Sequence, residues 1–318
     1  MAQMRAAMAA FLILGLGSAA AQAQSWQPPS DAQRCPSPWG PDDERGAANL
    51  MQADVILRAA RLIQRGEVIE MGYPLHPGMP FYGNRIYNQQ IKRTRWSTAS
   101  NPRGSNEEII TTELGQVGTQ IDGFGHQTIG ASHYNCFKID DIVTRTGFSR
   151  LGMENSGGFF TRGVLLDIAA LKGVDMLGDR YEITAEDLQA ALARQNLNLE
   201  TGDAVIINTG FWRLWGTDNA HYYRTQPGLG VAAAEWLAAQ QPMIVGADSC
   251  CVEVNPNPDP NLSSPVHQIL LVANGIYMIE SLKLDELIEK NVDEFAFTVQ
   301  PLKLTGATGS SVAPMAVH

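Results

Sequence analysis

Runs of apolar residues, several of them rich in valine and isoleucine, recur along the chain and predict buried β-strands. Most of these runs are bounded by glycine, proline, asparagine or aspartate, which favour turns. Nearly continuous apolar runs of this length are typical of strands covered on both faces, so we expect a sheet inside a large core. The predicted strands cover residues 68–75, 163–168, 204–209, 243–247, 276–279 and 294–304.

Helical patterns lie between these strands in the second half of the chain. Thr184 is a predicted N-cap, because acidic residues follow it in the first turn and Leu188, Ala191 and Leu192 then share one face. An alanine-rich stretch over 231–240 predicts a further helix. The alternation of strands and helices indicates a mixed α/β fold. Residues 254–266 contain four prolines and predict a long loop, and long loops in compact domains are often functional.

The beginning of the chain has the pattern of a secretory signal peptide. Arg5 precedes an apolar run that includes residues 11–14, and Ala21-Gln22-Ala23 fits the small-x-small cleavage pattern. The run is shorter than the roughly 20 residues that span a bilayer. We expect a signal peptide over 1–23, an N-terminal arm over 24–48 and a single domain over 49–318. This organisation predicts a periplasmic or secreted protein with no membrane span in the mature chain.

Composition and charge narrow the range of partners. The chain has 318 residues, of which 44% are hydrophobic and 18% charged, as is typical of a globular protein. Lys and Arg number 23 against 33 Asp and Glu, giving a net charge of −10 without a basic block, so we expect no nucleic-acid partner. The four cysteines allow three pairings, which the sequence leaves open, although the adjacent Cys250 and Cys251 are unfavourably placed to pair with each other.

A first polar cluster lies within residues 115–126. If residues 116–122 are extended, the two-residue period of a strand places Gln116, Gln120 and Asp122 on one face. Gly123 and Gly125 would then let the chain turn so that His126 returns to the same point. The alternative is an ordinary half-exposed strand whose polar side chains face water.

A second cluster begins directly after the proline-rich loop. His267 opens an apolar stretch, and Glu280 ends the strand predicted just before it. A carboxylate at the end of a buried strand is destabilising unless it pairs or binds a cation, and a salt bridge from Glu280 to Lys283 or an arginine is the alternative. Asp248 and Glu253 also follow a predicted strand, where a site residue and a loop cap are both reasonable. Together the two clusters supply carboxylates and imidazoles, the ligand types of a metal-assisted site.

At these residues the sequence resembles the cyclase family, which includes bacterial kynurenine formamidases and isatin hydrolase. The family signature His-x-Gly-Thr-His-x-Asp-x-x-x-His has its counterpart over 116–126, with Gln116 and Gln120 at the first two histidine positions. The resemblance implies an α/β fold, the swivelling β/β/α domain of this family. It extends in the same order through residues 77–80, 162–167, 202–203, 208–211, 227–229, 236–237 and 245–248.

The resemblance also implies a role for each position. Asp122 and Glu280 would be carboxylate ligands of a metal ion, His267 a nitrogen ligand and His126 the general acid or base. Gln116 and Gln120 are neutral amides, whose carbonyl oxygens suit hard ions better than zinc. We therefore expect no more than one divalent ion, Mn or Zn, with both glutamines beside it. Family resemblance further suggests a homo-oligomer, a dimer or larger.

Three functions are compatible with these residues. In the first, a metal-activated water cleaves an amide, formamide, lactam or lactone of a small-molecule substrate. In the second, Glu280 or His126 activates water without a metal; in the third, the pocket is a non-catalytic binding module. We favour the first, because buried acidic groups and imidazoles would be unfavourable without a cation. Aromatic residues could line a pocket for a flat substrate or pack in the core: Phe81, Tyr82, Trp96, Phe124 and Trp212.

Overall fold

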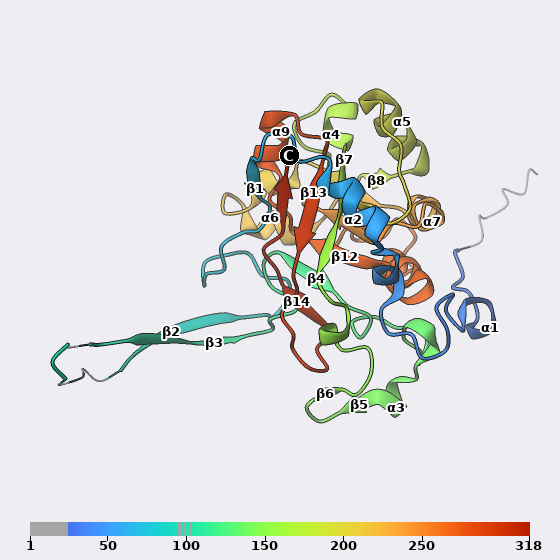
Figure 1. The fold of residues 1–318 in the computed structure, drawn as a ribbon. Coiled ribbons are helices and arrows are strands. Elements are labelled where there is room, and N and C mark those ends of the chain that lie inside the picture. The colour runs from blue at the N-terminus through green and yellow to red at the C-terminus, as the bar shows by residue number, and fades with distance from the viewer. Residues whose placement is uncertain (1–24, 95–96, 98, 102) are drawn as a thin grey trace, which may run out of the picture.

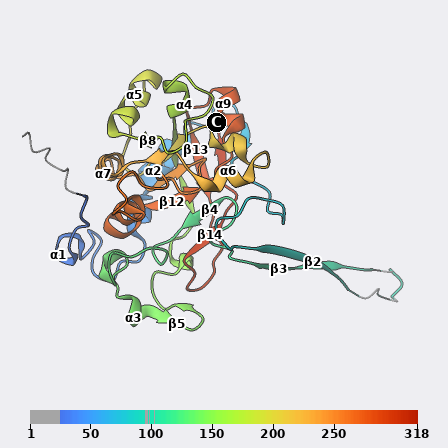
Figure 2. The ribbon, with the colours of Figure 1, turned by 180° about the vertical axis from the view of Figure 1, so that it is seen from behind.

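A mixed β-sheet runs through the centre of the molecule, with helices packed around it and a long hairpin, β2–β3, projecting from one side (Figures 1 and 2). The computed structural model describes residues 25–94, 97, 99–101 and 103–318. The predicted signal peptide over 1–23 and Trp96 lie outside these residues. The mixed α/β architecture confirms the fold class expected from the sequence.

The described residues form a nine-stranded central sheet. Its middle strands β7, β9, β11 and β12 are parallel, and the strands on both sides of them pair antiparallel. In order across the sheet the strands are β1 (Val68–Glu70), β15 (Met315–Val317), β13 (Glu294–Val299), β7 (Phe159–Asp167), β9 (Ala204–Asn208), β11 (Ile244–Ala247), β12 (Tyr277–Glu280), β4 (Gln120–Asp122) and β14 (Gly309–Ser311).

The predicted strands all appear in this sheet, and the central ones match best. Every residue of β9 and β11 is buried, as their continuous apolar sequences predict. Two of the predicted strands are longer than the observed ones. The strand expected over 68–75 ends at Glu70, shortly before Gly72 and Pro74, and the one expected over 294–304 ends at Val299, because Pro301 has no N–H group to continue the ladder.

Short two-stranded pairs complete the β-structure. The hairpin β2–β3 is almost entirely exposed and was not predicted, since polar and charged residues dominate both of its strands. The pairs are β2 (Tyr87–Arg93) with β3 (Asn106–Thr112), β5 (Val143–Thr144) with β6 (Gly147–Phe148), and β8 (Glu182–Ile183) with β10 (Gly228–Leu229).

Helices cover the sheet, and α2 and α5 both pack against β7. Helix α5 begins as predicted: Thr184 accepts a hydrogen bond from the Asp187 N–H at 3.2 Å, and the Asp187 carboxylate accepts one from the Thr184 N–H at 3.3 Å. The α-helices are α1 (Asp31–Arg34), α2 (Ala53–Ala60), α3 (Ile139–Ile142), α4 (Ile168–Leu171), α5 (Ala185–Gln195), α6 (Asn219–Arg224), α7 (Val231–Ala239), α8 (Pro265–His267) and α9 (Asp285–Lys290). Short 3-10 helices are η1 (Gly46–Leu50), η2 (Tyr134–Cys136), η3 (Met153–Asn155) and η4 (Phe211–Leu214), and η5 (Gln268–Ala273) is a π-helix.

A disulfide joins the segment before η1 to the body of the protein. Cys35 is bonded to Cys136, which selects one of the pairings that the sequence left open, and Cys250 and Cys251 are free thiols. The Ser37 N–H donates to the Asn135 side chain at 2.7 Å beside this link. Among the residues with described structure, no helix combines the length and apolar character needed to cross a membrane.

Candidate active site

Three polar side chains of the candidate site come from the paired strands β4 and β12. Gln120 lies directly opposite Glu280, and Asp122 lies two residues along β4, so all three share one face of the sheet. Gln120 Nε2 donates to Glu280 Oε2 at 2.8 Å. All three side chains are buried, although their polarity would favour water. The alternative reading of Glu280, a salt bridge to Lys283, does not occur, because Lys283 binds Asp285 instead.

Gln116 reaches the same point by a different route from the one predicted. Only residues 120–122 of the expected strand are extended, because Gly118 has a positive φ of 64° and the chain turns there. A Cβ atom at Gly118 would lie 2.3 Å from Cδ2 of Leu75, so the turn also depends on the absence of a side chain. Across this turn, Gln116 Nε2 donates to Asp122 Oδ1 at 2.8 Å. The prediction of a continuous strand was wrong, but the predicted convergence of side chains occurs.

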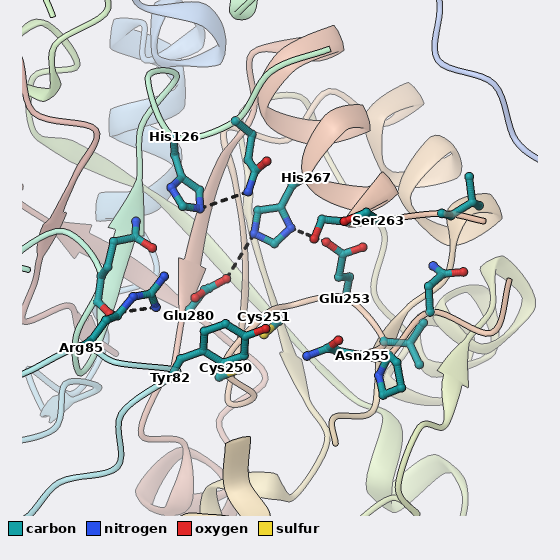
Figure 3. Close-up of a pocket in the computed structure, with 17 residues that line it drawn as sticks. Tyr82, Arg85, His126, Cys250, Cys251, Glu253, Asn255, Ser263, His267 and Glu280 are labelled. Atoms are coloured by element: carbon teal, nitrogen blue, oxygen red, sulfur yellow. Dashed lines mark hydrogen bonds and ion pairs between the residues drawn. The ribbon is translucent and has the colours of Figure 1, made fainter. Parts of the chain in front are cut away.

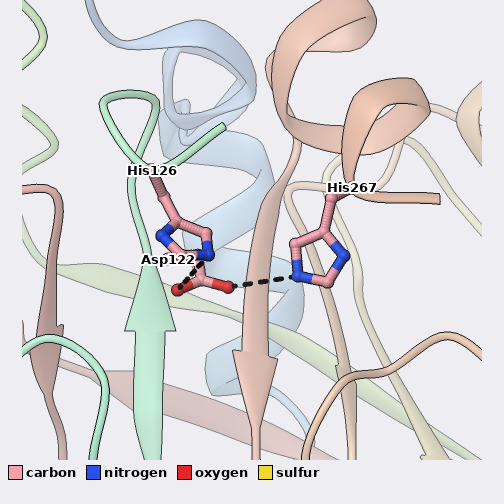
Figure 4. A group of neighbouring side chains, drawn as sticks. All are labelled: Asp122, His126 and His267. Atoms are coloured by element: carbon pink, nitrogen blue, oxygen red, sulfur yellow. Dashed lines mark ion pairs between the residues drawn. The ribbon is translucent and has the colours of Figure 1, made fainter. Parts of the chain in front are cut away.

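Two imidazoles face Asp122 from opposite sides (Figure 4). His126 follows a turn closed by a hydrogen bond from its own N–H to the carbonyl oxygen of Gly123 at 3.0 Å, and its Nε2 lies 4.0 Å from Asp122 Oδ1. His267 ends α8, and its Nε2 lies 3.7 Å from Asp122 Oδ2 and 3.3 Å from Glu280 Oε1. One donor atom from each of Asp122, His126 and His267 lies within 4.8 Å of the other two.

Glu253 fixes the orientation of the His267 ring through the Nδ1 atom. The Nδ1 of His267 donates to Glu253 Oε1, and the Val266 N–H donates to Glu253 Oε2 at 3.2 Å. The ring is therefore fixed with Nε2 directed toward Asp122 and Glu280. The sequence left Glu253 open as a site residue or a loop cap, and the structure places it at the site. Asp248, left open in the same way, is a cap: it accepts hydrogen bonds from the N–H groups of Thr209 and Trp212 at 2.8 and 3.1 Å.

Burial and neighbouring charges perturb the ionisable groups of the site. Burial, followed by the charge of Asp122, raises the pKa of Glu280 to about 7. Burial lowers the pKa of His267, but the charge of Glu253 and hydrogen bonds to Glu253 and Glu280 outweigh it, so the pKa lies well above its usual value. Burial lowers the pKa of His126, against the opposing effect of Asp122. One group that gains and loses a proton near neutral pH, Glu280, thus shares a pocket with two imidazoles whose pKa values are shifted in opposite directions.

The chemistry of these donors fits a divalent cation. Gln120 Oε1 and Asp122 Oδ2 are buried without a hydrogen-bond partner among the described residues. Unpartnered buried oxygens are costly unless a cation or water occupies the space beside them. Moreover, three buried carboxylates, those of Asp122, Glu253 and Glu280, surround the single imidazole of His267. A mixture of carboxylate, amide oxygen and imidazole ligands suits Mn or Zn.

A cavity of about 290 Å³ opens onto these residues (Figure 3). Of the four aromatic side chains proposed as pocket walls within the described residues, only Tyr82 lines it. Phe124 is 2% exposed and packs against Tyr134 and Tyr277 in the core, so it does not line the cavity. Trp212 packs at the edge of the main core and Phe81 on a small cluster that includes Met79, so neither lines the cavity.

Several lining residues escaped the sequence analysis. Arg85 and Gln127 reach the cavity from segments that flank the signature, and Cys250 and Cys251 from the segment after β11. The proline-rich loop forms another wall through Asn255 and Ser263, as its length suggested. The sequence signal for Glu253 was its position after a predicted strand, and Arg85 had no signal beyond its charge.

Comparisons with known proteins agree with this fold. A family model described as "Putative cyclase" matches residues 69–254. A crystal structure described as a novel cyclase has 31% sequence identity and a TM-score of 0.81, and the match covers 92% of this chain and 100% of that chain. No curated protein matches the chain.

Two isatin hydrolases share the fold at lower identity. Isatin hydrolase A from Ralstonia solanacearum is 20% identical with a TM-score of 0.56, covering 84% of this chain and 98% of that one. An isatin hydrolase bound to the product analogue thioisatinate is 18% identical with a TM-score of 0.57 and the same coverage, 84% and 98%. The family model spans more than half of the sequence and the novel cyclase aligns over nearly all of it. The chain therefore belongs to the cyclase family and has its swivelling β/β/α fold.

Proposed function

We propose that this chain is a hydrolase that cleaves a small amide, formamide or lactam, or the corresponding lactone, at a site that holds one divalent metal ion. The observation that carries the proposal is the pair of buried oxygens, Gln120 Oε1 and Asp122 Oδ2, that have no hydrogen-bond partner among the described residues, the second of them 3.7 Å from Nε2 of His267. The shared fold of the isatin hydrolases, which are named for hydrolysis of a cyclic amide, supports this reaction class.

Asp122, His267 and Glu280 would hold the ion, with Gln120 Oε1 beside it. Nε2 of His267 lies 3.3 Å from Glu280 Oε1 and 3.7 Å from Asp122 Oδ2. The Gln120 and Gln116 side chains each hold one carboxylate in place through a 2.8 Å hydrogen bond. When bound, the ion supplies a Lewis acid that lowers the pKa of water and polarises a carbonyl group.

His126 is the residue that we assign to proton transfer. Its side chain lines the cavity and is 19% exposed, so a substrate can approach it. Because burial lowers its pKa, the imidazole is neutral at pH 7 and able to accept a proton from water. The resulting imidazolium, stabilised by Asp122 at 4.0 Å, can then donate that proton to the leaving nitrogen.

A metal-independent hydrolase is the second candidate, and one observation favours it. Burial raises the pKa of Glu280 to about 7, so this carboxyl group gains and loses a proton near neutral pH. Such a group can act directly as a general base toward water. In this version Gln116 and Gln120 would orient the substrate.

Elemental analysis of the purified protein, together with hydrolysis of an amide and lactam panel, tests both versions. We expect about one equivalent of Mn or Zn and activity that is lost with chelator. His126→Gln should keep the metal and lose activity by roughly 100-fold or more, whereas Glu280→Gln should bind the metal more weakly and retain less of it on purification. Hydrolysis unaffected by chelator would favour the second candidate, and a metal-free protein without turnover would indicate a binding module.

We also propose that the mature protein is exported to the periplasm or the medium. The Arg5, apolar-run and Ala21-Gln22-Ala23 pattern supports export, and the Cys35–Cys136 disulfide suits an oxidising compartment. Mass spectrometry of the extracytoplasmic fraction should find a chain that begins near Gln24; an intact Met1 in the cytoplasm would contradict this. The homo-oligomer stays a prediction that light scattering can check.

A further inference from the structure

Arg85 is a cation in a pocket whose other charged groups are mainly acidic. It lies in the wall formed with Tyr82 and Gln116, next to the acidic group that contains Glu280 (Figure 3). Its guanidinium carbon lies 5.4 Å from the centre of the Tyr82 ring, and its Nη1 donates to the backbone oxygen of Gln116 at 3.1 Å. Arg85 is half-buried, so the side chain is held without being enclosed.

The guanidinium has no anionic partner. Within residues 25–94, 97, 99–101 and 103–318, no carboxylate oxygen lies within 4.0 Å of Arg85, although Arg162, for example, binds both Asp203 and Glu294. Guanidinium offers five N–H donors in a planar fork, and the single hydrogen bond to Gln116 uses one of them. The remaining donors suit a planar carboxylate.

We propose that Arg85 binds a carboxylate group of the substrate, so that the substrate is a small amide that carries a carboxylate as well as the bond to be cleaved. This inference rests on the proposed hydrolase function. Gln116 connects Arg85 to the candidate metal site: its backbone oxygen accepts a hydrogen bond from Arg85, and its side chain donates one to Asp122. A carboxylate on Arg85 would therefore lie at a fixed offset from the reacting centre.

The surroundings of Arg85 favour a monoanion over a phosphate group. The three buried carboxylates of the site repel negative charge, and a second charge on the ligand would increase that repulsion. The cavity of about 290 Å³ restricts the ligand to a small molecule. Gln127 and Asn255 also line the cavity and offer neutral amide groups for the rest of the ligand.

Calorimetric titration with benzoate and benzamide, two probes of similar shape and different charge, tests the inference without turnover. The titrations use metal-stripped and Mn-loaded protein, so that binding to a metal is separated from binding to Arg85. We expect the parent to prefer benzoate by about 10- to 100-fold in both forms. Arg85→Gln should lose this preference and Arg85→Lys should keep part of it, because lysine retains the charge without the planar fork.

Arg213 provides a matched control outside the pocket. It also lies over an aromatic ring, 4.3 Å from the centre of Trp212, and also donates to one backbone oxygen, that of Asp175. Arg213→Gln should bind both probes as the parent does. Equal binding of benzoate and benzamide to the parent, an unchanged preference in Arg85→Gln, or a preference for inorganic phosphate over benzoate would each overturn the inference.

Hydrolysis separates this inference from the proposed function. The substrates are N-formyl-L-phenylalanine and its neutral carboxamide, and the readout is the ratio of their kcat/KM values. Arg85→Gln should lower the ratio of acid to carboxamide by about 10- to 100-fold. If the parent hydrolyses no amide while the Arg85-dependent preference for benzoate persists, the hydrolase proposal fails and the carboxylate site stands. If the parent hydrolyses both substrates and Arg85→Gln leaves the ratio unchanged, the carboxylate site fails alone.

Discussion

The affinity of the site for a divalent ion should rise steeply with pH. In the metal-free protein, Glu280 has a pKa raised by burial to about 7, and that of His267 lies well above its usual value because Glu253 outweighs the effect of burial. Both groups therefore hold protons in weakly acidic solution. A cation needs the neutral imidazole and the ionised carboxylate, so binding must displace these protons.

The size of the effect follows from the number of protons displaced. Each one changes the apparent affinity by about tenfold per pH unit, in the direction of tighter binding as the pH rises. Below about pH 7 both Glu280 and His267 are protonated, so log affinity should rise with a slope of about 2. Raising the pH from about 5.5 to about 6.5 should then strengthen binding by about 100-fold. Above about pH 7 Glu280 has already lost its proton, so the slope should fall.

A competition titration of Mn or Zn against a chelating dye, repeated at several pH values, measures this slope. Glu280→Gln removes one of the two protons, so its slope in acid should fall to about 1, along with a weaker affinity. Glu107→Gln changes an exposed carboxylate on β3 and should behave as the parent does. An affinity that stays constant across this pH range, or an unchanged slope of about 2 in Glu280→Gln, would refute the assignment of these groups to the ion.

Three further predictions concern the strand, the turn and the cap around the site. Gln120→His should raise zinc affinity, measured by the same titration, because imidazole nitrogen is a better zinc donor than amide oxygen; no gain would contradict the facing of Gln120 toward the ion. Gly118→Ala should lower the free energy of unfolding by about 1–3 kcal/mol in urea titration, because a positive φ and a contact with Leu75 both oppose the new methyl group; an unchanged stability would show that the turn tolerates a side chain. Burial raises the pKa of Asp248 from 3.8 to about 6, so the folded state binds this proton more tightly and its contribution to stability falls as the pH rises from about 4 to about 6, by about 2 kcal/mol. Asp248→Asn should remove that fall. Urea titrations of the parent and the variant at about pH 4 and about pH 6 measure the free energy of unfolding of each. If the variant differs from the parent by the same amount at both pH values, the assignment to Asp248 is excluded.

The parts of the fold that the sequence predicted are those set by local pattern. Strands β9 and β11 are buried on both faces, and apart from Asn208 at the end of β9 their residues are apolar or small, which made them recognisable in the sequence. The cap of α5 depends on Thr184 and Asp187, which lie three residues apart. By contrast, the exposed hairpin β2–β3 lacks the one-sided apolar pattern that identifies a strand, and most of its sheet contacts are within the pair itself.

The site was predictable only in part, because several of its contacts depend on how distant segments meet. The facing of Gln120 and Asp122 follows from the two-residue period of a strand, but the turn at Gly118 that returns Gln116 to Asp122 breaks this period. Glu253 belongs to the site only because α8 presents His267 to it. Phe124 illustrates the reverse error: it stands within the signature, but its ring packs against Tyr134 and Tyr277.

The Cys35–Cys136 link constrains the order in which the chain can mature. In a chain that leaves the membrane amino-terminus first, as export would require, Cys35 emerges alone and the next thiol, 101 residues later, is its native partner. Cys250 and Cys251, the two thiols of the pocket, emerge only afterwards. If the chain is exported as proposed, pairing of consecutive cysteines during translocation would yield the native bond and leave the pocket thiols unused. Refolding the complete, reduced chain offers Cys35 all three partners at once, so protein recovered in this way would carry a greater risk of a disulfide that blocks the pocket.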